Sequence, residues 1–282
     1  MFFFRVLVWI ACRLSRRGAA RVGAALGLLW HALIPVRRRH VRASIRACLG
    51  YDTRTARQVA RRVYRNLGVN ALEFLRLPLL RDPRAVKDFI DTRELTKVDA
   101  LLARGRGLLV LTAHFGNWEL LAASQALAGY EIAVVTKTMK ATRINAFWMK
   151  HRAQTGLSLL PASGSGRALI ETLKRGASVG FVLDQHTPGG VVVDFFGRPA
   201  ATTSGLARLH EISGAPLVPA FLVRTDLCSH RILIGDEIPF TREATREQTV
   251  CTMTQKYTHA LEAMVRAHPD QWLWLHRRWK VV

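Results

Sequence analysis

Short apolar runs alternate with longer amphipathic segments from residue 107 to residue 267, and this alternation limits the possible folds more than any other feature. The runs predict strands at 107–112, 131–136, 158–161, 178–183, 216–223 and 231–235, and the intervening segments predict helices at 117–128, 142–155, 167–175, 203–213 and 244–267. A segment with several glycines, 188–198, precedes the fourth of these helices. Because such alternation is typical of parallel sheets, we predict an α/β fold: a mostly parallel central sheet flanked by helices on both faces.

The residues before this region predict helices. Residues 40–77 carry apolar side chains at helical spacing, with a break near Gly50 and an end at Pro78. A further helix is expected from Thr92 to Ala103. The chain has 282 residues, about half of them apolar, which is enough for one large domain or two small ones with a substantial core.

Positive charge is concentrated at the amino-terminal end. Residues 1–70 contain 15 arginines and one acid, Asp52, whereas the rest of the chain has 27 basic and 19 acidic side chains. Such a basic region favours an anionic partner, either a membrane surface or a nucleic acid. Nucleic-acid binding would require basic residues interleaved with exposed aromatic residues on a recognisable module, and the sequence has none. We therefore expect membrane lipids, and no nucleic acid, as partners.

Two apolar runs lie within this basic region, at residues 2–11 and 19–36. Neither reaches the roughly 20 apolar residues of a membrane-spanning helix. We interpret them as interfacial or re-entrant helices, with arginines at the lipid headgroups. The predicted organisation is a membrane-anchoring basic apolar segment, residues 1–40, followed by a catalytic domain, residues 41–282.

A secretory signal peptide is the alternative explanation of the first apolar run. Gly18-Ala19-Ala20 offers small residues for cleavage, but Arg13, Arg16 and Arg17 separate them from the run, which argues against it. The four cysteines are widely scattered, without the spacing of a zinc site. We expect them to be reduced, with no metal ion and with the catalytic domain in the cytoplasm.

A histidine and a glutamate, His114 and Glu119, follow the strand predicted at 107–112. On one ideal helix they would lie about 140° apart, so they can pair only if His114 is in a loop and Glu119 is in the first helical turn. Gly116 allows that bend and Asn117 is a good N-cap. Glu119 would then orient the imidazole as a general base. Alternatively, Glu119 is a first-turn acid favoured by the helix dipole, and His114 is an ordinary loop residue.

Active sites of open α/β sheets gather at the carboxyl ends of strands, where His114 and Asp184 are both expected. The sequence has no Gly-x-Ser-x-Gly nucleophile elbow and no His-Glu-x-x-His zinc motif. A covalent enzyme intermediate is therefore not indicated. Direct attack by a substrate hydroxyl group, activated by His114, is the simpler hypothesis.

Several blocks of the sequence resemble the lipid A biosynthesis acyltransferase family, the lauroyl/myristoyl transferases of the HX4D/E acyltransferase superfamily. In chain order the blocks are His114–Glu119, Arg152 with Gly156, Asp184, Phe195–Ala200, Gly214–Pro219 and His268–Lys280. The HX4E motif alone is a weak signal, but several blocks in order are a strong one. The resemblance covers essentially the whole chain.

This resemblance implies that an acyl chain moves from a thioester of acyl carrier protein or coenzyme A to a hydroxyl group of a lipid A precursor, without a cofactor. It also implies a glycerolipid-acyltransferase-like fold for the acyltransferase domain, and a place at the cytoplasmic face of the bacterial inner membrane in lipopolysaccharide biosynthesis. Acyl carrier protein is acidic, so a basic rim is expected to speed its encounter with the enzyme.

The same resemblance assigns roles to single residues. His114 would be the general base and Glu119 its orienting partner. Arg152 and Asp184 would be further active-site residues, with Arg152 contacting a phosphate or the thioester oxyanion. The alternatives are a surface arginine and an aspartate that caps a turn. Further substrate-binding residues are expected at Asn117, Phe195, Phe196 and Gly197. Phe195 and Phe196, together with the tryptophans, are expected to border an acyl groove or the membrane interface. For Trp272, Trp274 and Trp279 the alternative is a place in the core.

The segment Asp184–Pro188 departs from the sequence that some family members carry there. This departure leaves the acceptor open between a lipid A precursor and another lipid, such as a lysophospholipid, an ornithine-type lipid or a phospholipid glycoside. A catalytically inactive membrane scaffold is a further alternative, against which the intact His114 and Glu119 argue. None of these features predicts an acyl chain length or an oligomeric state.

Overall fold

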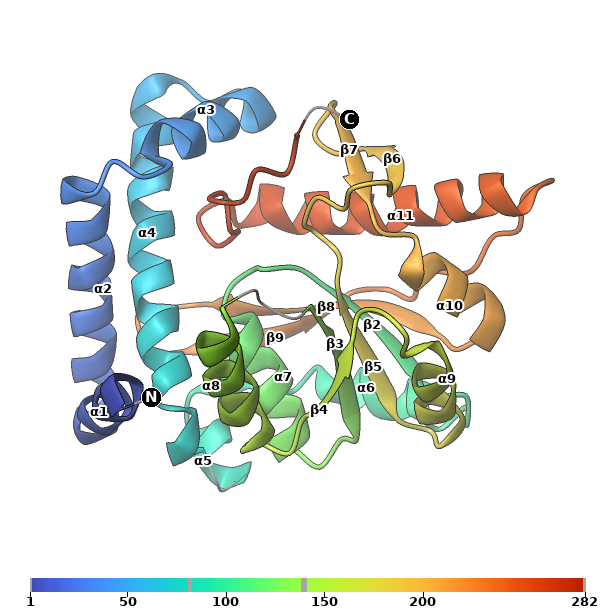
Figure 1. The fold of residues 1–282 in the computed structure, drawn as a ribbon, viewed down its shortest axis with the longest axis horizontal. Coiled ribbons are helices and arrows are strands. Elements are labelled where there is room, and N and C mark those ends of the chain that lie inside the picture. The colour runs from blue at the N-terminus through green and yellow to red at the C-terminus, as the bar shows by residue number, and fades with distance from the viewer. Residues whose placement is uncertain (1, 81–82, 138–140, 281–282) are drawn as a thin grey trace.

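The computed structural model describes residues 2–80, 83–137 and 141–280 (Figure 1). Its centre is a seven-stranded sheet with the strand order β1-β9-β8-β2-β5-β3-β4. The strands are β1 (Ile90–Asp91), β2 (Leu108–Thr112), β3 (Ile132–Thr136), β4 (Ser158–Pro161), β5 (Ser178–Val182), β8 (Leu217–Arg224) and β9 (His230–Ile234). Neighbouring strands are parallel except for the antiparallel hairpin β8–β9. The prediction of a mostly parallel sheet is therefore confirmed.

Helices cover both faces of this sheet. They are α5 (Pro83–Lys87), α6 (Leu95–Leu102), α7 (Trp118–Leu127), α8 (Thr142–Ala153), α9 (Gly166–Lys174), α10 (Gly205–Ser213) and α11 (Arg246–Ala267), with a short 3-10 turn at Leu77–Leu79. Alternate residues of β2 fill two cores. Leu109 and Leu111 pack with side chains of α9, α10 and α11, and Leu108 and Val110 pack with side chains of α5 to α8. A strand buried on both faces is a continuous apolar run, which is why the sequence predicts it.

The amino-terminal part of the described chain forms the helices α1 (Phe2–Arg13), α2 (Arg16–Leu33), α3 (Arg38–Leu49) and α4 (Thr53–Leu75). Helices α2 and α4 lie side by side (Figure 1). Glycines bring their backbones into contact, since a Cβ atom on Gly27 would lie 2.1 Å from the Tyr64 carbonyl oxygen. A Cβ atom on Gly68 would lie equally close, 2.1 Å, to the carbonyl oxygen of Gly23. Helix α4 carries its other side chains into the main core, so the amino-terminal helices are fixed to the sheet.

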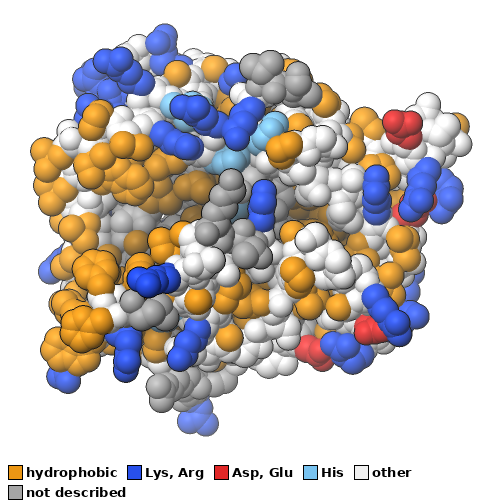
Figure 2. Space-filling view, in the orientation of Figure 1, with side chains coloured by type: hydrophobic (Ala, Val, Ile, Leu, Met, Phe, Trp, Pro, Cys, Tyr) orange, Lys and Arg blue, Asp and Glu red, His pale blue; other side chains and the backbone are white. Residues whose placement is uncertain are grey.

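The outer side of α1 and α2 is apolar and exposed. Phe2 is 82% exposed, Trp9 60% and Leu33 74%. Figure 2 shows hydrophobic side chains gathered along this flank of the molecule. Of the described helices, none alone has the length and hydropathy to cross a membrane; only α2 together with α3, bent by 96°, meets both criteria. Membrane attachment of residues 1–40, and a domain boundary at residue 40, stay predictions.

Two small strand features were not predicted. Strands β6 (Val191–Asp194) and β7 (Pro199–Thr202) form an antiparallel pair that packs on α11. The glycines of this segment obscure the strand pattern of the pair in the sequence. Gly190 is nevertheless required, because a Cβ atom on it would lie 2.4 Å from the Thr202 carbonyl oxygen. Strand β1 has two residues, too few for a periodic pattern to be recognised.

Candidate active site

The loop that carries His114 makes a sharp turn between β2 and α7. Gly116 has a φ angle of 53°, and a Cβ atom on it would lie 1.7 Å from the Leu222 carbonyl oxygen of β8. Its N–H donates to the Gln271 carbonyl oxygen at 2.8 Å. Only glycine fits this position, because it combines a left-handed backbone with close contact to a neighbouring strand. The predicted loop for His114, followed by a helix that begins after Asn117, is therefore confirmed.

His114 pairs with Asp184, which follows the neighbouring strand β5. The imidazole Nδ1 lies 2.8 Å from Asp184 Oδ1, and the His114 backbone N–H donates to Asp184 Oδ2 at 3.0 Å. The Trp272 indole N–H also donates to Oδ2, at 2.8 Å. Burial opposes the charge on Asp184, but the His114 ring and these hydrogen bonds outweigh it and hold the pKa of the carboxyl below its ordinary value. Asp184 is therefore an ionised acceptor, and His114 Nδ1 carries the proton that it accepts.

The other ring nitrogen of His114 is free to act as a base. Its Nε2 atom lies 3.3 Å from the side-chain amide nitrogen of Gln185, which donates to it. The His114 side chain is 22% exposed, whereas that of Asp184 is 3% exposed. A substrate can thus reach the imidazole while the carboxylate stays protected, which is the arrangement of an oriented general base.

The predicted pairing of His114 with Glu119 is wrong in this structure. Glu119 accepts hydrogen bonds from Arg152 Nε at 2.7 Å and Nη2 at 2.5 Å. The indole N–H groups of Trp118 and Trp148 donate to the same carboxylate at 3.1 and 3.0 Å. Three of these four hydrogen bonds come from side chains of α8, and none of the four comes from His114. Asp184 holds the place beside the imidazole that the spacing had assigned to Glu119, and Arg152 is a paired residue rather than a free surface arginine.

Glu119 and Arg152 lie in the wall of a narrow pocket between the sheet and helices α7 and α8. Its empty space amounts to about 510 Å³, including the part open to solvent. Apart from these two charged residues, the lining is mainly apolar: Val110, Thr112, Trp118, Leu121, Ala122, Gln125, Ile132, Val134, Leu157, Leu159, Gly180 and Val182. The Trp118 ring also contacts the His114 ring, with centroids 5.1 Å apart. The pocket therefore adjoins the histidine through one shared aromatic side chain.

Helix α4 supports the same loop through the side chain of Glu73. Asn117 caps α7, as predicted, by accepting from the Leu120 N–H, and its side-chain amide donates to Glu73 at 2.7 Å. Glu73 also accepts from Arg224 at 2.6 and 2.7 Å. Burial opposes the charge of Glu73, but Arg224 outweighs it and lowers the pKa of this carboxyl. Asn117 thus has a structural role in positioning the loop, and its predicted contact with substrate stays a prediction.

Phe195, Phe196 and Gly197 lie apart from the pocket lining. Phe195 packs edge-on against Trp272, with centroids 5.5 Å apart, and both aromatic rings are buried. Phe196 is also buried, and Gly197 is the exposed turn between β6 and β7. Both phenylalanines are core residues, and the core alternative holds for Trp272 and Trp274, each 1% exposed. Phe195 supports the tryptophan that donates to Asp184, whereas Phe196 packs on Trp274. A direct contact of the phenylalanines with substrate is a prediction that this arrangement does not favour.

Two residues of the site were missed from the sequence. Gln185 follows Asp184 directly, and its position at a strand end was the available signal. Trp272 lies 88 residues beyond Asp184, and no spacing rule brings them together. The link is the tail, whose Leu273 N–H donates to the His114 carbonyl oxygen at 3.0 Å.

Known proteins share this sequence pattern over its full length. A family described as bacterial lipid A biosynthesis acyltransferase matches residues 1–281. A phosphatidylinositol mannoside acyltransferase of Mycobacterium tuberculosis is 28% identical over 66% of this chain, and the match spans 58% of that protein's length. A lipid A biosynthesis palmitoleoyltransferase of Escherichia coli is 24% identical over 97% of this chain and 89% of its own. The chain therefore belongs to the bacterial lipid A biosynthesis acyltransferase family, a family of acyltransferases.

Proposed function

We propose that the protein transfers a fatty acyl chain from a thioester to a hydroxyl group of a membrane glycolipid. The observation that carries this proposal is the His114–Asp184 pair beside an apolar pocket. The pair supplies a base with a fixed tautomer, and the pocket supplies an environment suited to a hydrocarbon chain. The family and the names of its members support the same reaction class.

The chemistry follows from the free nitrogen of His114. Nε2 takes the proton of the acceptor hydroxyl group as its oxygen attacks the thioester carbonyl carbon. The new C–O bond forms, the C–S bond breaks, and the thiolate takes the proton back from the imidazolium. Asp184 holds the ring and stabilises its positive charge during the transfer. No residue of the enzyme needs to become acylated.

Arg152 and Glu119 are assigned to the donor. Glu119 holds the guanidinium by two hydrogen bonds, so Arg152 is fixed in the pocket wall. A guanidinium in that position is suited to stabilise the negative charge that develops on the thioester oxygen. Glu119 is then a positioning residue for Arg152. The donor is a thioester of acyl carrier protein or coenzyme A, and the basic surface favours the acidic carrier protein.

The acceptor is proposed to be a lipid A precursor in lipopolysaccharide biosynthesis. The palmitoleoyltransferase of Escherichia coli, which matches nearly the whole chain, supports this choice. The mycobacterial relatives support a second candidate, a phospholipid glycoside. Mass spectrometry of lipids from a deletion strain separates the two. Lipid A lighter by one acyl group supports the first, and unchanged lipid A with an altered phospholipid supports the second.

The site of action is proposed to be the cytoplasmic face of the bacterial inner membrane. The exposed apolar side chains of α1 and α2 would enter the lipid, and the arginines of residues 1–70 would meet anionic headgroups. Each arginine near an anionic surface contributes roughly 1 kcal/mol, less at high salt. The same helices are packed on α4, so docking would hold the site near its lipid substrates.

Acyl transfer by the purified protein tests this function. Wild type is incubated with acyl carrier protein thioesters, acyl coenzyme A and bacterial lipids, and the masses of the acceptor lipids are measured by mass spectrometry. We expect acceptors heavier by one acyl chain, and a loss of about 10²–10⁴-fold in His114→Ala without a change in melting temperature. Hydrolysis of thioester with no acylated lipid, or full activity in His114→Ala, would contradict the proposal. Acylated lipid formed by the wild type would exclude the inactive-scaffold alternative.

A further inference from the structure

A group of cationic side chains lies beside the active site, on the carboxyl-terminal segment, the turn between α2 and α3, the start of α3, the segment after β5 and the turn between β6 and β7. It consists of Arg37, Arg198, Arg277 and Lys280, with His40, His186 and His276 between them. Figure 2 shows Lys, Arg and His side chains gathered in the upper part of this face, where α3 and the end of the chain lie, while the Asp and Glu side chains visible in this view are at its right-hand side. We call this group the basic cluster.

Hydrogen bonds attach the basic cluster to the catalytic loop. Arg37 donates to the Leu275 carbonyl oxygen, and His40 Nε2 lies 3.3 Å from the His276 carbonyl oxygen. The His186 backbone N–H donates to His276 Nε2 at 3.0 Å. His186 is two residues beyond Asp184, and the segment that carries His276 is bonded to the His114 carbonyl through Leu273. The cluster therefore has a fixed position next to the reacting imidazole.

The positive charge of this cluster is not neutralised. Among the described residues, no carboxylate lies within 4.0 Å of Arg37, Arg198, Arg277 or Lys280. The active-site arginine Arg152, by contrast, has Glu119 as its partner. Arginines and a lysine held together without acids generate a field that attracts an anion.

A buried arginine strengthens this field. Arg278 is 1% exposed, and its guanidinium donates to the Ala201 carbonyl oxygen and the Thr202 hydroxyl, neither of which carries a charge. Its Nε atom and His186 Nδ1 are buried without a hydrogen-bond partner among the described residues. Burial lowers the pKa of the Arg278 guanidinium to about 10, although the nearby charge of Asp184 opposes this shift. A bound anion would offset more of the cost of burying this cation. Buried polar atoms that lack partners next to an exposed cationic group are features expected of an anion-binding site.

We propose that the basic cluster binds a phosphate ester on the headgroup of the acceptor lipid, and so sets which hydroxyl group reaches His114. Arg277, Lys280 and Arg37 are exposed and would contact the phosphate oxygens directly. This inference rests on the proposed acyl transfer and adds the residues that would hold the acceptor headgroup and orient it toward His114. The amino-terminal helices bind the membrane surface, whereas the basic cluster selects one headgroup in it.

The test compares two forms of one acceptor, the phosphorylated glycolipid and the same lipid after enzymatic removal of its phosphate. For wild type we expect kcat/KM to be about tenfold higher for the phosphorylated form, mainly through KM. In the Arg277→Ala/Lys280→Ala double variant this ratio should fall close to one. Arg277→Lys/Lys280→Arg, which keeps both charges, should keep most of it.

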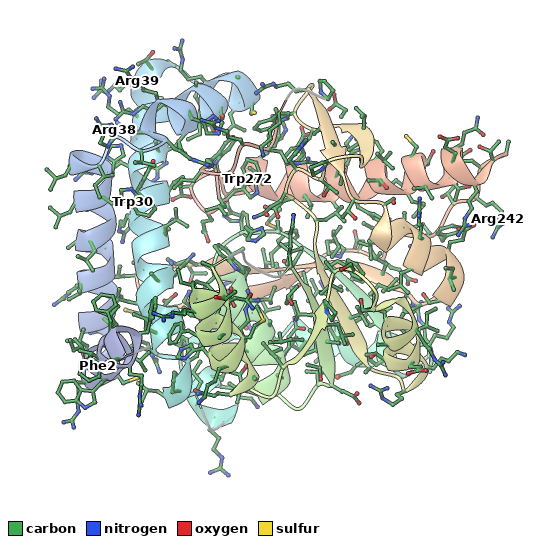
Figure 3. The ribbon with its side chains drawn as sticks, in the orientation of Figure 1. Phe2, Trp30, Arg38, Arg39, Arg242 and Trp272 are labelled. Carbon is green, nitrogen blue, oxygen red and sulfur yellow. The ribbon has the colours of Figure 1, made fainter. Side chains whose placement is uncertain are left out.

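The matched control is Arg242→Ala/Arg246→Ala, which removes the same charge from the opposite end of the molecule, where Figure 3 labels Arg242. It should keep the wild-type ratio. Inorganic phosphate and binding to vesicles of anionic phospholipid distinguish the possible sources of phosphate. Because inorganic phosphate would compete for the same cluster, it should lower kcat/KM for the phosphorylated acceptor only, and equal inhibition with both acceptor forms would overturn the proposal. If vesicle binding falls together with the ratio, the cluster is a membrane contact, which also overturns it. Transfer to both acceptor forms at equal rates by wild type would also overturn it, while leaving the acyl transfer itself established.

Discussion

At the scale of single residues, the site depends on the register of two strands. Thr112 of β2 is opposite Val182 of β5, and the Leu183 N–H donates to the Thr112 carbonyl oxygen. His114 and Asp184 each lie two residues beyond this pair, so the parallel register brings them to the same level. The sequence places both at strand ends, but it does not say that β2 and β5 are neighbours. The partner of the histidine therefore could not be predicted from spacing, and the nearer acid was chosen wrongly.

The Glu119–Arg152 pair should contribute to stability as a unit. Both side chains are largely buried, at 7% and 18% exposure, so removal of one leaves an unpaired charge. We expect Glu119→Ala or Arg152→Ala to lower the free energy of unfolding by about 3 kcal/mol, and the double variant to lose less than the sum of the two. Urea denaturation measures this coupling. Strictly additive losses would mean that the two side chains do not stabilise each other.

At the scale of elements, continuous apolar runs were the reliable signal. Strands β2, β5 and β8 are buried on both faces, and the sequence predicts all three. The break at Gly50 also follows from the sequence, because Gly50 ends α3 in a left-handed conformation. Which distant elements pack together cannot be predicted from such local signals. In α2 the spacing of Gly23 and Gly27 is the G-x-x-x-G pattern of close helix packing, but the sequence does not say that Gly68 of α4 is opposite to it.

Strand β5 is expected to set the length of the bound acyl chain. Gly180 lines the pocket, and a Cβ atom on it would meet Val134 Cγ2 at an ordinary distance of 3.7 Å, so larger residues fit the backbone and extend into the pocket. In the series Gly180→Ala, Gly180→Val and Gly180→Leu, the preferred acyl chain should become progressively shorter. We expect kcat/KM for the longest accepted chain to fall about tenfold in Gly180→Leu.

A panel of acyl thioesters of increasing length measures this preference. The shortest substrates serve as the internal control, since they do not reach the added side chain. An equal loss for every chain length would mean that the pocket next to Trp118 does not hold the acyl chain.

At the scale of the whole molecule, charge and exposed apolar surface are both concentrated at one end. Helix α1 carries exposed Phe2, Phe3 and Trp9, and the first 70 residues carry 15 arginines. In Phe2→Ser/Phe3→Ser/Trp9→Ser we expect the affinity for vesicles of anionic phospholipid to fall at least about tenfold, because apolar area no longer enters the lipid. Co-sedimentation with vesicles measures the binding.

The matched control is Ile212→Ser, which removes a side chain that is 58% exposed on α10, away from these helices. It should leave vesicle binding at the wild-type level. Added salt should weaken binding by wild type, since the arginines act through a screened field. An equal effect of the control variant would show that no particular face enters the membrane.

Acid should destabilise the fold through a buried histidine. Burial lowers the pKa of His210 to about 4, from an ordinary value of 6.5. Between about pH 6.5 and about pH 4, His210 is protonated in the unfolded chain but neutral in the folded protein. The free energy of unfolding therefore falls as the pH decreases over this interval. His210→Gln should lose less stability over that interval. Urea denaturation at pH 7 and pH 4.5 measures this loss of stability for wild type and His210→Gln, and equal losses in the two proteins would contradict the assignment. Carboxylates with a lowered pKa, such as Asp184, affect stability at lower pH.

The central claim is that Asp184 orients His114 for the chemical step. The most direct measurement is the single-turnover rate of acyl transfer at saturating donor and acceptor, compared among wild type, Asp184→Asn and Glu119→Gln. We predict that Asp184→Asn lowers this rate by about 10²–10⁴-fold with little change in donor affinity, and that Glu119→Gln, which acts only through Arg152, lowers it by less. A rate for Asp184→Asn within threefold of wild type, in a protein of unchanged melting temperature, would contradict the account.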